Sequence, residues 1–492
     1  AVPSRAAPRP NIILILTDDL DSQSIAAMPA LQSLLVKQGT LFSRFFVSMP
    51  LCAPSRASIL RGQYPHNHGV LNNTGVNGGF PAFFDFGDEA STVATWLHDA
   101  GYRTGLFGKY LNRYPKEAPR TYVPPGWDAW FGLMEGGANY YLDFTLNENG
   151  TPVAYGGKPE DYLTDVLADK AAAFIGSGGD QALFAYIAPY APHAPSTPPP
   201  RYANAFADVK APRGPAFNEA DVSDKPAWLR ASPLLTPNQI DRIDQHYRDR
   251  LRSLLAVDDL LRKLVDLLQA QGRLADTCIA FTSDNGFQLG EHRLPLGKQT
   301  AYEESIRVPL IVRGPGVPQG KTVDQLTLNS DLAPTFAAWA AASAPDFVDG
   351  RSLLPLFDET PPAGWRDAIL IEDEPVIRFQ RAAPAHATPV ATPIATPIAT
   401  PGAADDEDTS KISPAEPPPY NAIRTTRYLY VAYDDGEREV YDLQTDPAEL
   451  TNVAATTAPA LLAAFADRLE ALRTCRAGSC RAAEDAPFPS PD

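Results

Sequence analysis

Five short apolar runs, rich in β-branched residues, divide the first two thirds of the chain. The first, 11–17 (NIILILT), has no polar alternation and ends directly in Asp18 and Asp19. A continuous run of this kind predicts a strand that is buried on both faces, as in parallel sheets. The other four runs lie at 103–107, 182–188, 278–282 and 308–312.

A long amphipathic helix is predicted between these runs, at 239–271, because its apolar residues recur at helical spacing. Strands that alternate with helices favour an α/β fold in which a large, mostly parallel sheet lies between two layers of helices. Ligands of such sheets bind at the carboxyl ends of the strands. The polar residues expected at those ends are Asp18, Asp19, Lys109, His193, Asp284 and Asn285.

The composition changes near Pro375. Residues 387–401 repeat ATPVATPIATPIATP with a period of four. Proline at this spacing excludes a helix or a central strand, so we predict a solvated, semi-extended insertion at about 384–419 that is dispensable for the core. A hairpin is predicted after it at 428–433 and 439–443, and a helix at 460–473. The expected organisation is a large domain at 1–372 and a smaller α+β domain at 373–492.

Charge and composition narrow the class of protein. The chain has 492 residues, of which 44% are hydrophobic and 21% charged, which excludes global disorder. The net charge of −17 disfavours nucleic acid as a partner, and an anionic ligand would need a local basic pocket. No run of 18 apolar residues occurs, so no transmembrane helix is predicted. Residues 1–10 contain no apolar core of a secretion signal, so any such signal is absent from this chain.

The chain has four cysteines, Cys52, Cys278, Cys475 and Cys480. The last two have the C-x4-C spacing of a small disulfide loop, with two unpaired thiols as the alternative. A disulfide would place the protein in a secreted, periplasmic or other oxidising compartment.

The segment that begins at Cys52 carries the sharpest local pattern. On chemistry alone, a cysteine at a helix start beside Arg56 is either an activated nucleophile or a buried structural thiol. The longer string at 52–65, C-x-P-S-R-A-S-x-L-x-G-x-Y-P, resembles the signature of the type I sulfatases. In that family the cysteine is oxidised to formylglycine by a formylglycine-generating enzyme. The resemblance implies an alkaline-phosphatase-like fold, a catalytic domain at 1–372 and hydrolysis of sulfate esters.

Other segments resemble the same family. The similarity extends to the segments around Asp284, His193 and Lys298, which read TSDNG, APYAPHAP and GKQTAYEESIRVP. Carboxylate and amide oxygens without a Cys/His cluster favour Ca2+, with Mg2+ as the alternative. The implied metal ligands are Asp18, Asp19, Asp284, Asn285 and Cys52. The implied catalytic and sulfate-binding residues are Cys52, Arg56, Lys109, His193 and Lys298, with Arg56 positioning the formylglycine.

One departure from the family pattern concerns the substrate. Many members carry a histidine two residues after the lysine that matches Lys109, whereas this chain has Tyr110, Leu111 and Asn112 there. The string GKYLNRYP and the terminal LRTCRAGSC are similar to the N-acetylglucosamine-6-sulfatase branch. This similarity implies 6-sulfated N-acetylglucosamine or a related sulfated sugar as substrate. The predicted substrate contacts are Asn112, His292 and His68.

Three alternatives stay open at this point. The chain could be an arylsulfatase, a phosphomonoester or phosphonate-ester hydrolase of the same superfamily, or a catalytically silent glycan-binding relative.

The acidic pair Asp258 and Asp259 lies inside the predicted long helix and is expected to be a solvated or helix-packing pair.

Overall fold

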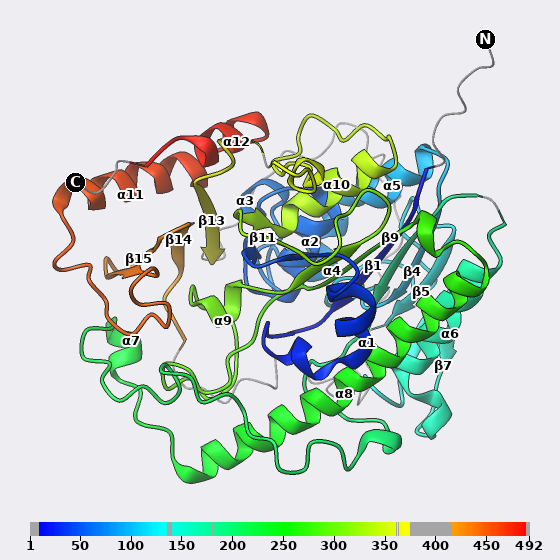
Figure 1. The fold of residues 1–492 in the computed structure, drawn as a ribbon, viewed down its shortest axis with the longest axis horizontal. Helices are drawn as coiled ribbons and strands as arrows, with labels where there is room; N and C mark the ends of the chain where they lie inside the picture. The colour runs from blue at the N-terminus through cyan, green and yellow to red at the C-terminus, as the bar shows by residue number, and fades with distance from the viewer. Residues whose placement is uncertain are drawn as a thin grey trace, which may run out of the picture.

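The computed structural model describes residues 9–134, 140–179, 181–360, 362, 364–373 and 416–488. Its centre is a ten-stranded mixed sheet in the order β11-β2-β10-β9-β1-β8-β4-β5-β6-β7 (Figure 1). The strands are β1 (Asn11–Thr17), β2 (Thr40–Phe42), β4 (Arg103–Gly108), β5 (Ala129–Leu133), β6 (Thr145–Glu148), β7 (Thr151–Ala154), β8 (Leu183–Ala188), β9 (Thr277–Ser283), β10 (Leu310–Arg313) and β11 (Lys321–Val323).

Strand β1 lies near the middle of this sheet, between β9 and β8. Its alternate side chains enter different clusters: Ile13 and Ile15 pack on one face, and Ile12, Leu14 and Leu16 on the other. Because successive residues of a strand point to opposite faces, a strand covered on both sides needs an apolar residue at each position. The run NIILILT meets this requirement, and β1 has the predicted bounds.

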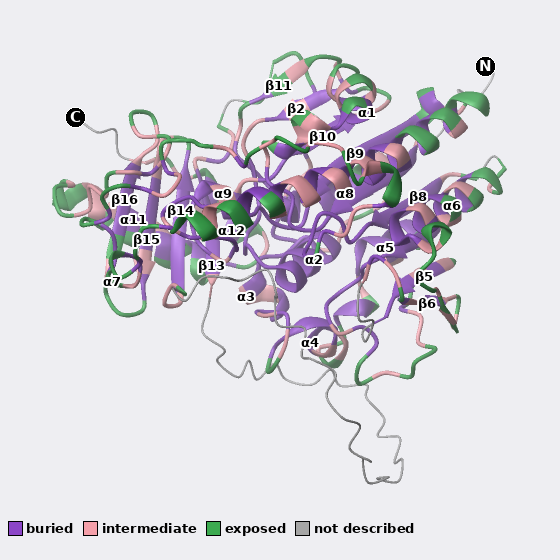
Figure 2. Cartoon of the chain, turned by 90° about the horizontal axis from the view of Figure 1, so that it is seen from below, coloured by how far each residue is buried: buried purple, intermediate pink, exposed green. Residues whose placement is uncertain are grey.

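Helices cover both faces of the sheet, which confirms the predicted α/β architecture. One face packs against α1 (Pro29–Leu31), α6 (Leu163–Gly176) and α8 (Pro237–Ala270), and the other against α2 (Cys52–Arg61), α4 (Gly79–Asp85), α5 (Val93–Asp99) and α10 (Leu332–Trp339). Figure 2 shows the buried strands between these outer helices. Further short elements include α3 (Pro65–His68), α7 (Ala227–Arg230), α9 (Glu303–Ile306), β3 (Phe45–Phe46) and β12 (Thr327–Leu328).

The direction of the edge strands differs from the centre of the sheet. The five strands β9, β1, β8, β4 and β5 are parallel, whereas β10 pairs antiparallel with β9. Strands β6 and β7 are also antiparallel to their neighbours. The run at 308–312 predicted a strand, but an apolar run does not encode strand direction, so the mixed edges were not predictable from it.

Helix α8 begins two residues before the predicted start. Thr236 caps it, and its hydroxyl accepts a hydrogen bond from the Gln239 backbone N–H while the Gln239 side chain returns to the Thr236 backbone. Pro237 occupies the first turn, where its missing N–H costs nothing.

The Asp258 carboxylate accepts from the backbone N–H groups of Ala30 and Leu31, both at 2.8 Å, so this acidic residue packs α8 against α1 as expected.

A second, four-stranded antiparallel sheet lies beside the large one, toward the C-terminal end of the chain (Figure 1). It consists of β13 (Ala368–Asp373), β14 (Tyr420–Thr425), β15 (Tyr428–Tyr433) and β16 (Arg438–Asp442), covered by α11 (Pro459–Arg473) and α12 (Gly478–Asp485). The predicted hairpin corresponds to β15 and β16, which pair antiparallel. The sheet starts at Ala368, five residues ahead of position 373, where the domain division was predicted. The repeat at 387–401 lies outside the described residues.

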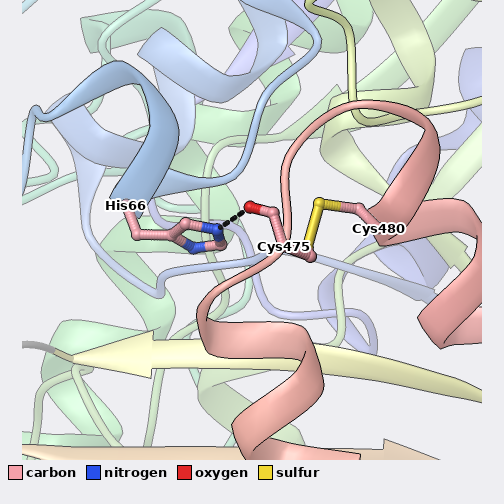
Figure 3. Close-up of side chains that lie close together, drawn as sticks. All are labelled: His66, Cys475 and Cys480. Atoms are coloured by element: carbon pink, nitrogen blue, oxygen red, sulfur yellow. Dashed lines mark hydrogen bonds between the residues drawn. A yellow bond between two sulfur atoms is a disulfide. The ribbon is translucent and has the colours of Figure 1, made fainter.

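Cys475 and Cys480 form the predicted disulfide (Figure 3). The loop that they close is held against α3 by His66. The His66 Nε2 lies 2.9 Å from the Cys475 carbonyl oxygen, and its Nδ1 lies 2.7 Å from Glu372 Oε1. Burial lowers the pKa of His66, but the Glu372 carboxylate outweighs burial and raises it to about 9. A doubly protonated ring can donate to both acceptors, so this contact joins α3, β13 and the disulfide loop.

His66 is expected to make the folded state sensitive to alkaline pH. Its folded pKa of about 9 exceeds the unfolded value of about 6.5, so its contribution is fully present below pH 6.5 and is lost as pH rises through about 9. The shift corresponds to roughly 3 kcal/mol of unfolding free energy. Urea unfolding of the native chain and of His66→Gln should show a difference that shrinks between about pH 6 and pH 10. A difference independent of pH would contradict the charged His66.

Candidate active site

The site forms where two neighbouring parallel strands end. Thr17 of β1 pairs with Ser283 of β9, so the residues that follow them start side by side. Asp18, Asp19, Asp284 and Asn285 are all fully buried. The Asp19 backbone N–H donates to Asp284 Oδ1 at 3.1 Å, and Asn285 Nδ2 donates to Asp19 Oδ1 at 2.7 Å. The sheet register therefore brings together four oxygen-bearing side chains that are far apart in sequence.

The backbone at Asp19 allows both neighbouring carboxylates to face the same space. Asp19 has a φ of +63°, in the left-handed region that aspartate tolerates better than most residues. In an extended strand, Asp18 and Asp19 would point to opposite faces. Here Asp18 Oδ1 lies 3.5 Å from Cys52 Sγ, and Asp19 Oδ1 lies 2.5 Å from the Lys298 Nζ that also contacts that sulfur.

Cys52 is the first residue of α2 and faces these carboxylates. Leu51 before it is extended, and Pro54 lies in the first turn of the helix, where no backbone donor is required. Gly62 ends α2 in the left-handed conformation, with a φ of +68°. Lys298 Nζ donates to Cys52 Sγ at 3.0 Å. The helix start thus fixes the Cys52 side chain, fully buried, at the centre of the site.

Three cations contact the three carboxylates directly. Lys109, just after β4, approaches Asp18 Oδ2 at 2.5 Å. Arg56, one turn after Cys52 on α2, donates from Nε to Asp284 Oδ2 at 2.8 Å. Lys298 lies 2.5 Å from Asp19 Oδ1. Buried carboxylates are costly without such partners, and the same cations provide the local positive charge that the acidic chain needs to attract an anion.

His193 is the remaining polar side chain of the site. Its Nδ1 lies 2.8 Å from the Ala194 carbonyl oxygen, which can only accept, so Nδ1 carries a hydrogen. Its Nε2 lies 3.6 Å from Asp19 Oδ2. The ring therefore presents Nε2 to the site, in the position of a proton donor or acceptor.

Burial and neighbouring charges act in opposite directions on the acids of the site. Burial raises the pKa of the Cys52 thiol well above its usual range, although Lys109 and Lys298 lower it. Burial also favours the neutral form of Asp18, but Lys109, His193 and Arg56 together bring its pKa below the usual value. Asp18 is therefore a carboxylate at neutral pH, and Cys52 is a neutral thiol.

The oxygens in this site fit a hard divalent cation. Asp19 Oδ2 and Asn285 Oδ1 are buried and have no hydrogen-bond partner among the described residues. Donor atoms of Asp18, Asp19, Cys52 and His193 lie within 4.8 Å of one another. Carboxylate and amide oxygens are the ligands that Ca2+ and Mg2+ prefer. Unsatisfied oxygens at the centre of a buried acidic cluster are best explained by a cation that would bind them.

Two small pockets flank the buried centre. Lys109, Asn112 and Tyr190 line one of about 20 Å3, and the Asn112 Oδ1 is buried there with no hydrogen-bond partner in the described chain. Lys298 and Gln288 line the other, of about 70 Å3. Asn112 is thus placed beside Lys109, where a substrate group could accept from or donate to its amide.

Two of the predicted substrate contacts lie elsewhere. His68 is fully buried behind α2, with Nε2 3.0 Å from Ser58 Oγ and Nδ1 accepting from the Val70 backbone at 3.1 Å. His292 is also fully buried, and its ring stacks on Tyr302 with centroids 4.0 Å apart. Neither residue lines the two pockets at the site. The side chains of both residues are therefore buried away from these pockets.

Two residues that support the site were missed from the sequence. Asn73 Oδ1 accepts from the Ala53 backbone N–H at 2.8 Å and so helps to fix the start of α2. No local pattern marked Asn73. Arg250 is fully buried on α8 and donates to the Asp19 backbone oxygen. The sequence could have indicated that Arg250 is buried, because it lies on the apolar stripe of the helix, three residues after Tyr247.

Comparison with known proteins assigns this geometry to a family. The sulfatase family model matches residues 10–342. The chain is 37% identical over 489 residues to the human N-acetylglucosamine-6-sulfatase, covering 96% of this chain and 86% of that protein. It is 33% identical over 512 residues to an arylsulfatase of Volvox carteri, covering 96% of this chain and 76% of that protein.

Solved structures show the same fold at lower identity. A protein solved in complex with its substrate D-glucosamine-2-N,6-O-disulfate has a TM-score of 0.71 at 24% identity, covering 94% of this chain and 97% of that chain. A phosphonate monoester hydrolase of Agrobacterium radiobacter has a TM-score of 0.68 at 24% identity, covering 94% and 95%. At this identity the likeness establishes the alkaline-phosphatase-like fold alone. With a family match over most of the chain, however, this protein belongs to the sulfatase family and is a sulfuric ester hydrolase.

Proposed function

We propose that the chain removes sulfate from 6-sulfated N-acetylglucosamine or a related sulfated sugar, using a formylglycine made from Cys52. The observation that carries this proposal is the position of Cys52, 3.0 Å from Lys298 and 3.5 Å from Asp18 at the centre of a buried site of paired cations and carboxylates. The substrate class is supported by the 37% identity to an N-acetylglucosamine-6-sulfatase over 96% of the chain. A formylglycine-generating enzyme would be the partner during maturation.

Asp18, Asp19, Asp284 and Asn285 would hold a divalent cation, with Ca2+ favoured over Mg2+ because flexible, all-oxygen coordination suits it. When bound, the cation would stabilise negative charge on sulfate oxygens and acidify a hydroxyl group of the formylglycine hydrate. The unpartnered Asp19 Oδ2 and Asn285 Oδ1 support this ligand set. Arg56, in contact with both Asp284 and the Lys109 carbonyl, would keep α2 and its first residue aligned with the ligands.

The chemistry assigned to the side chains follows from their places around residue 52. One hydroxyl of the hydrated aldehyde attacks sulfur, and the alcohol of the substrate leaves. Lys109 and Lys298 stabilise the negative charge that develops on the sulfate oxygens. His193 donates a proton to the departing alcohol oxygen from Nε2. Loss of a proton from the second hydroxyl then reforms the aldehyde and expels sulfate.

The disulfide supports a proposal for the environment of the protein. The Cys475–Cys480 bond supports a secreted, periplasmic or other oxidising compartment. No helix among the described residues is long and apolar enough to cross a membrane.

A panel of esters tests the proposed function. Matured protein is expected to release sulfate from N-acetylglucosamine-6-sulfate with a kcat/KM at least about tenfold above that for an aryl sulfate, because the pocket at Asn112 can address a sugar hydroxyl or amide. Phosphate and phosphonate esters of the same alcohols should be poorer substrates still. The Asn112→Ala variant should lose activity on the sugar sulfate more than on the aryl sulfate.

Other results of the panel identify the competing functions. Preference for the phosphonate ester would favour a phosphonate hydrolase, and equal loss on both sulfates in Asn112→Ala would remove the assigned role of Asn112. Sugar binding without turnover by fully matured protein would favour the silent glycan-binding relative.

A further inference from the structure

A second cluster of buried ligand atoms lies apart from Cys52. His292 comes from the loop after β9, Glu304 from α9, and Glu449 from the turn after β16. One donor atom from each lies within 4.8 Å of the other two. His292 is fully buried and Glu449 is 1% exposed. The cluster therefore joins the loops of the large sheet to the smaller one.

The orientation of the His292 ring is fixed by groups behind it. Nδ1 lies 2.7 Å from Glu219 Oε2, and a carboxylate in this position accepts the Nδ1 hydrogen. Glu219 is itself 3.6 Å from the Lys225 ammonium, which helps to hold it in place. The stacked ring of Tyr302 prevents His292 from turning over. A carboxylate on one ring nitrogen, with the other nitrogen facing oxygen donors, is the arrangement of histidines that ligate metals.

One side-chain atom of each residue in the cluster has no hydrogen-bond partner among the described residues. These atoms are His292 Nε2, Glu304 Oε2 and Glu449 Oε1, and all three are buried. With the hydrogen on Nδ1, donated to an ionised Glu219, Nε2 presents a lone pair to Glu304 Oε2 at 3.9 Å. A lone pair that faces carboxylate oxygens in a buried space is unfavourable unless a proton or a metal cation lies between them.

We propose that His292, Glu304 and Glu449 form a second metal site, for a zinc-class divalent ion. One imidazole nitrogen with two carboxylates is a ligand set for Zn2+ and its neighbours in the transition series, whereas Ca2+ prefers oxygen alone. Tetrahedral ligation at about 2.0–2.1 Å needs donors roughly 3.4 Å apart, slightly closer than the 3.9 Å between His292 Nε2 and Glu304 Oε2. Glu304 is only partly buried, so its side chain can close this gap.

An acidic pocket gives the ion a way in. It has a volume of about 180 Å3, and Glu304 lines it together with Asp21, Glu291 and Glu303. The carboxylates in its wall attract cations, and solvent in the pocket can supply the fourth ligand of a tetrahedral ion. Glu449 Oε2 also accepts from the Glu303 backbone N–H at 3.1 Å, so a bound ion would strengthen the contact between α9 and the C-terminal turn.

The test uses the full chain saturated with Ca2+, to which Zn2+ alone is added. We expect one equivalent of Zn2+ to bind and the melting temperature to rise by about 2–5 °C. Co2+ in place of Zn2+ should give visible bands typical of a four-coordinate ion. Both effects should disappear in Glu304→Gln, whose partly exposed side chain makes it the variant that folds most readily, and in Glu449→Gln.

Two controls separate this site from the one at Cys52. Glu291→Gln, in the wall of the acidic pocket but outside the cluster, should keep the bound Zn2+. Asp19→Asn, which removes a ligand of the proposed Ca2+ site, should also keep it. Failure of the native chain to retain a Zn2+ equivalent, or loss of that equivalent in Asp19→Asn but not in Glu304→Gln, would overturn the proposal. Both readouts are independent of sulfate turnover, so they stand whether or not the proposed function is correct.

Discussion

Replacing Cys52 by alanine is expected to reduce sulfate release at least about a thousandfold, because an enzyme that loses its nucleophile keeps only the catalysis given by binding and electrostatics. The fold should survive. Cys52 is fully buried, but the change removes a single sulfur atom, and Lys298 keeps its ion pair with Asp19 at 2.5 Å. Turnover and thermal unfolding, measured on the same preparation, check both parts.

The matched control is Cys278→Ala. Cys278 is the other free cysteine of the described chain, is equally buried and lies inside β9. This variant should lose some stability, since it leaves a small cavity in the core, but should keep its turnover. A Cys52→Ala protein with a tenth of native activity would show that the cysteine is not the precursor of the nucleophile.

Removal of the divalent cation is expected to stop turnover and to destabilise the fold together. Dialysis against a chelator leaves Asp18, Asp19 and Asp284 buried without the two positive charges of the cation, and Asp18→Asn should lower turnover about a thousandfold even with metal present. Ca2+ at a hundred times its Kd should return about 2.7 kcal/mol of unfolding free energy. Melting curves and turnover across a Ca2+ titration measure both effects.

A buried aspartate outside the site provides the comparison. Asp88 is 1% exposed and pairs with Arg61 at 3.3 Å. Asp88→Asn should cost stability but keep the full response to Ca2+. Chelated native protein that retains full activity would contradict the metal assignment, and restoration by Mg2+ alone would change the identity of the ion.

Local sequence patterns predicted the centre of the fold well. Strand β1 has the bounds expected from NIILILT, because a strand buried on both faces leaves an uninterrupted apolar run. The strands β5, β6 and β7 were not predicted. Their burial is mixed, as in Thr151–Ala154, where most residues are exposed, so neither an apolar run nor a clean alternation marks them.

The site was predictable to the extent that its residues sit in motifs. Cys52, Lys109, His193 and Lys298 come from four separate segments, and the fold brings them around Asp18 and Asp19. Asn73 lies in none of these motifs, because its contribution is one hydrogen bond to the backbone of a residue 20 positions away. His68 is the opposite case: it lies close to the Cys52 motif in sequence, but the turn after α2 places it behind the helix, in contact with Ser58.

The most direct test is the mass of the peptide that contains residue 52 in catalytically active protein. Cleavage after Arg44 and Arg56 isolates residues 45–56. Conversion of the cysteine to formylglycine lowers the mass of this peptide by about 18 Da and abolishes its reaction with thiol reagents. Preparations made with increasing amounts of a formylglycine-generating enzyme should show sulfate turnover in proportion to the converted fraction. Full turnover by protein in which residue 52 is entirely unmodified cysteine would contradict the account.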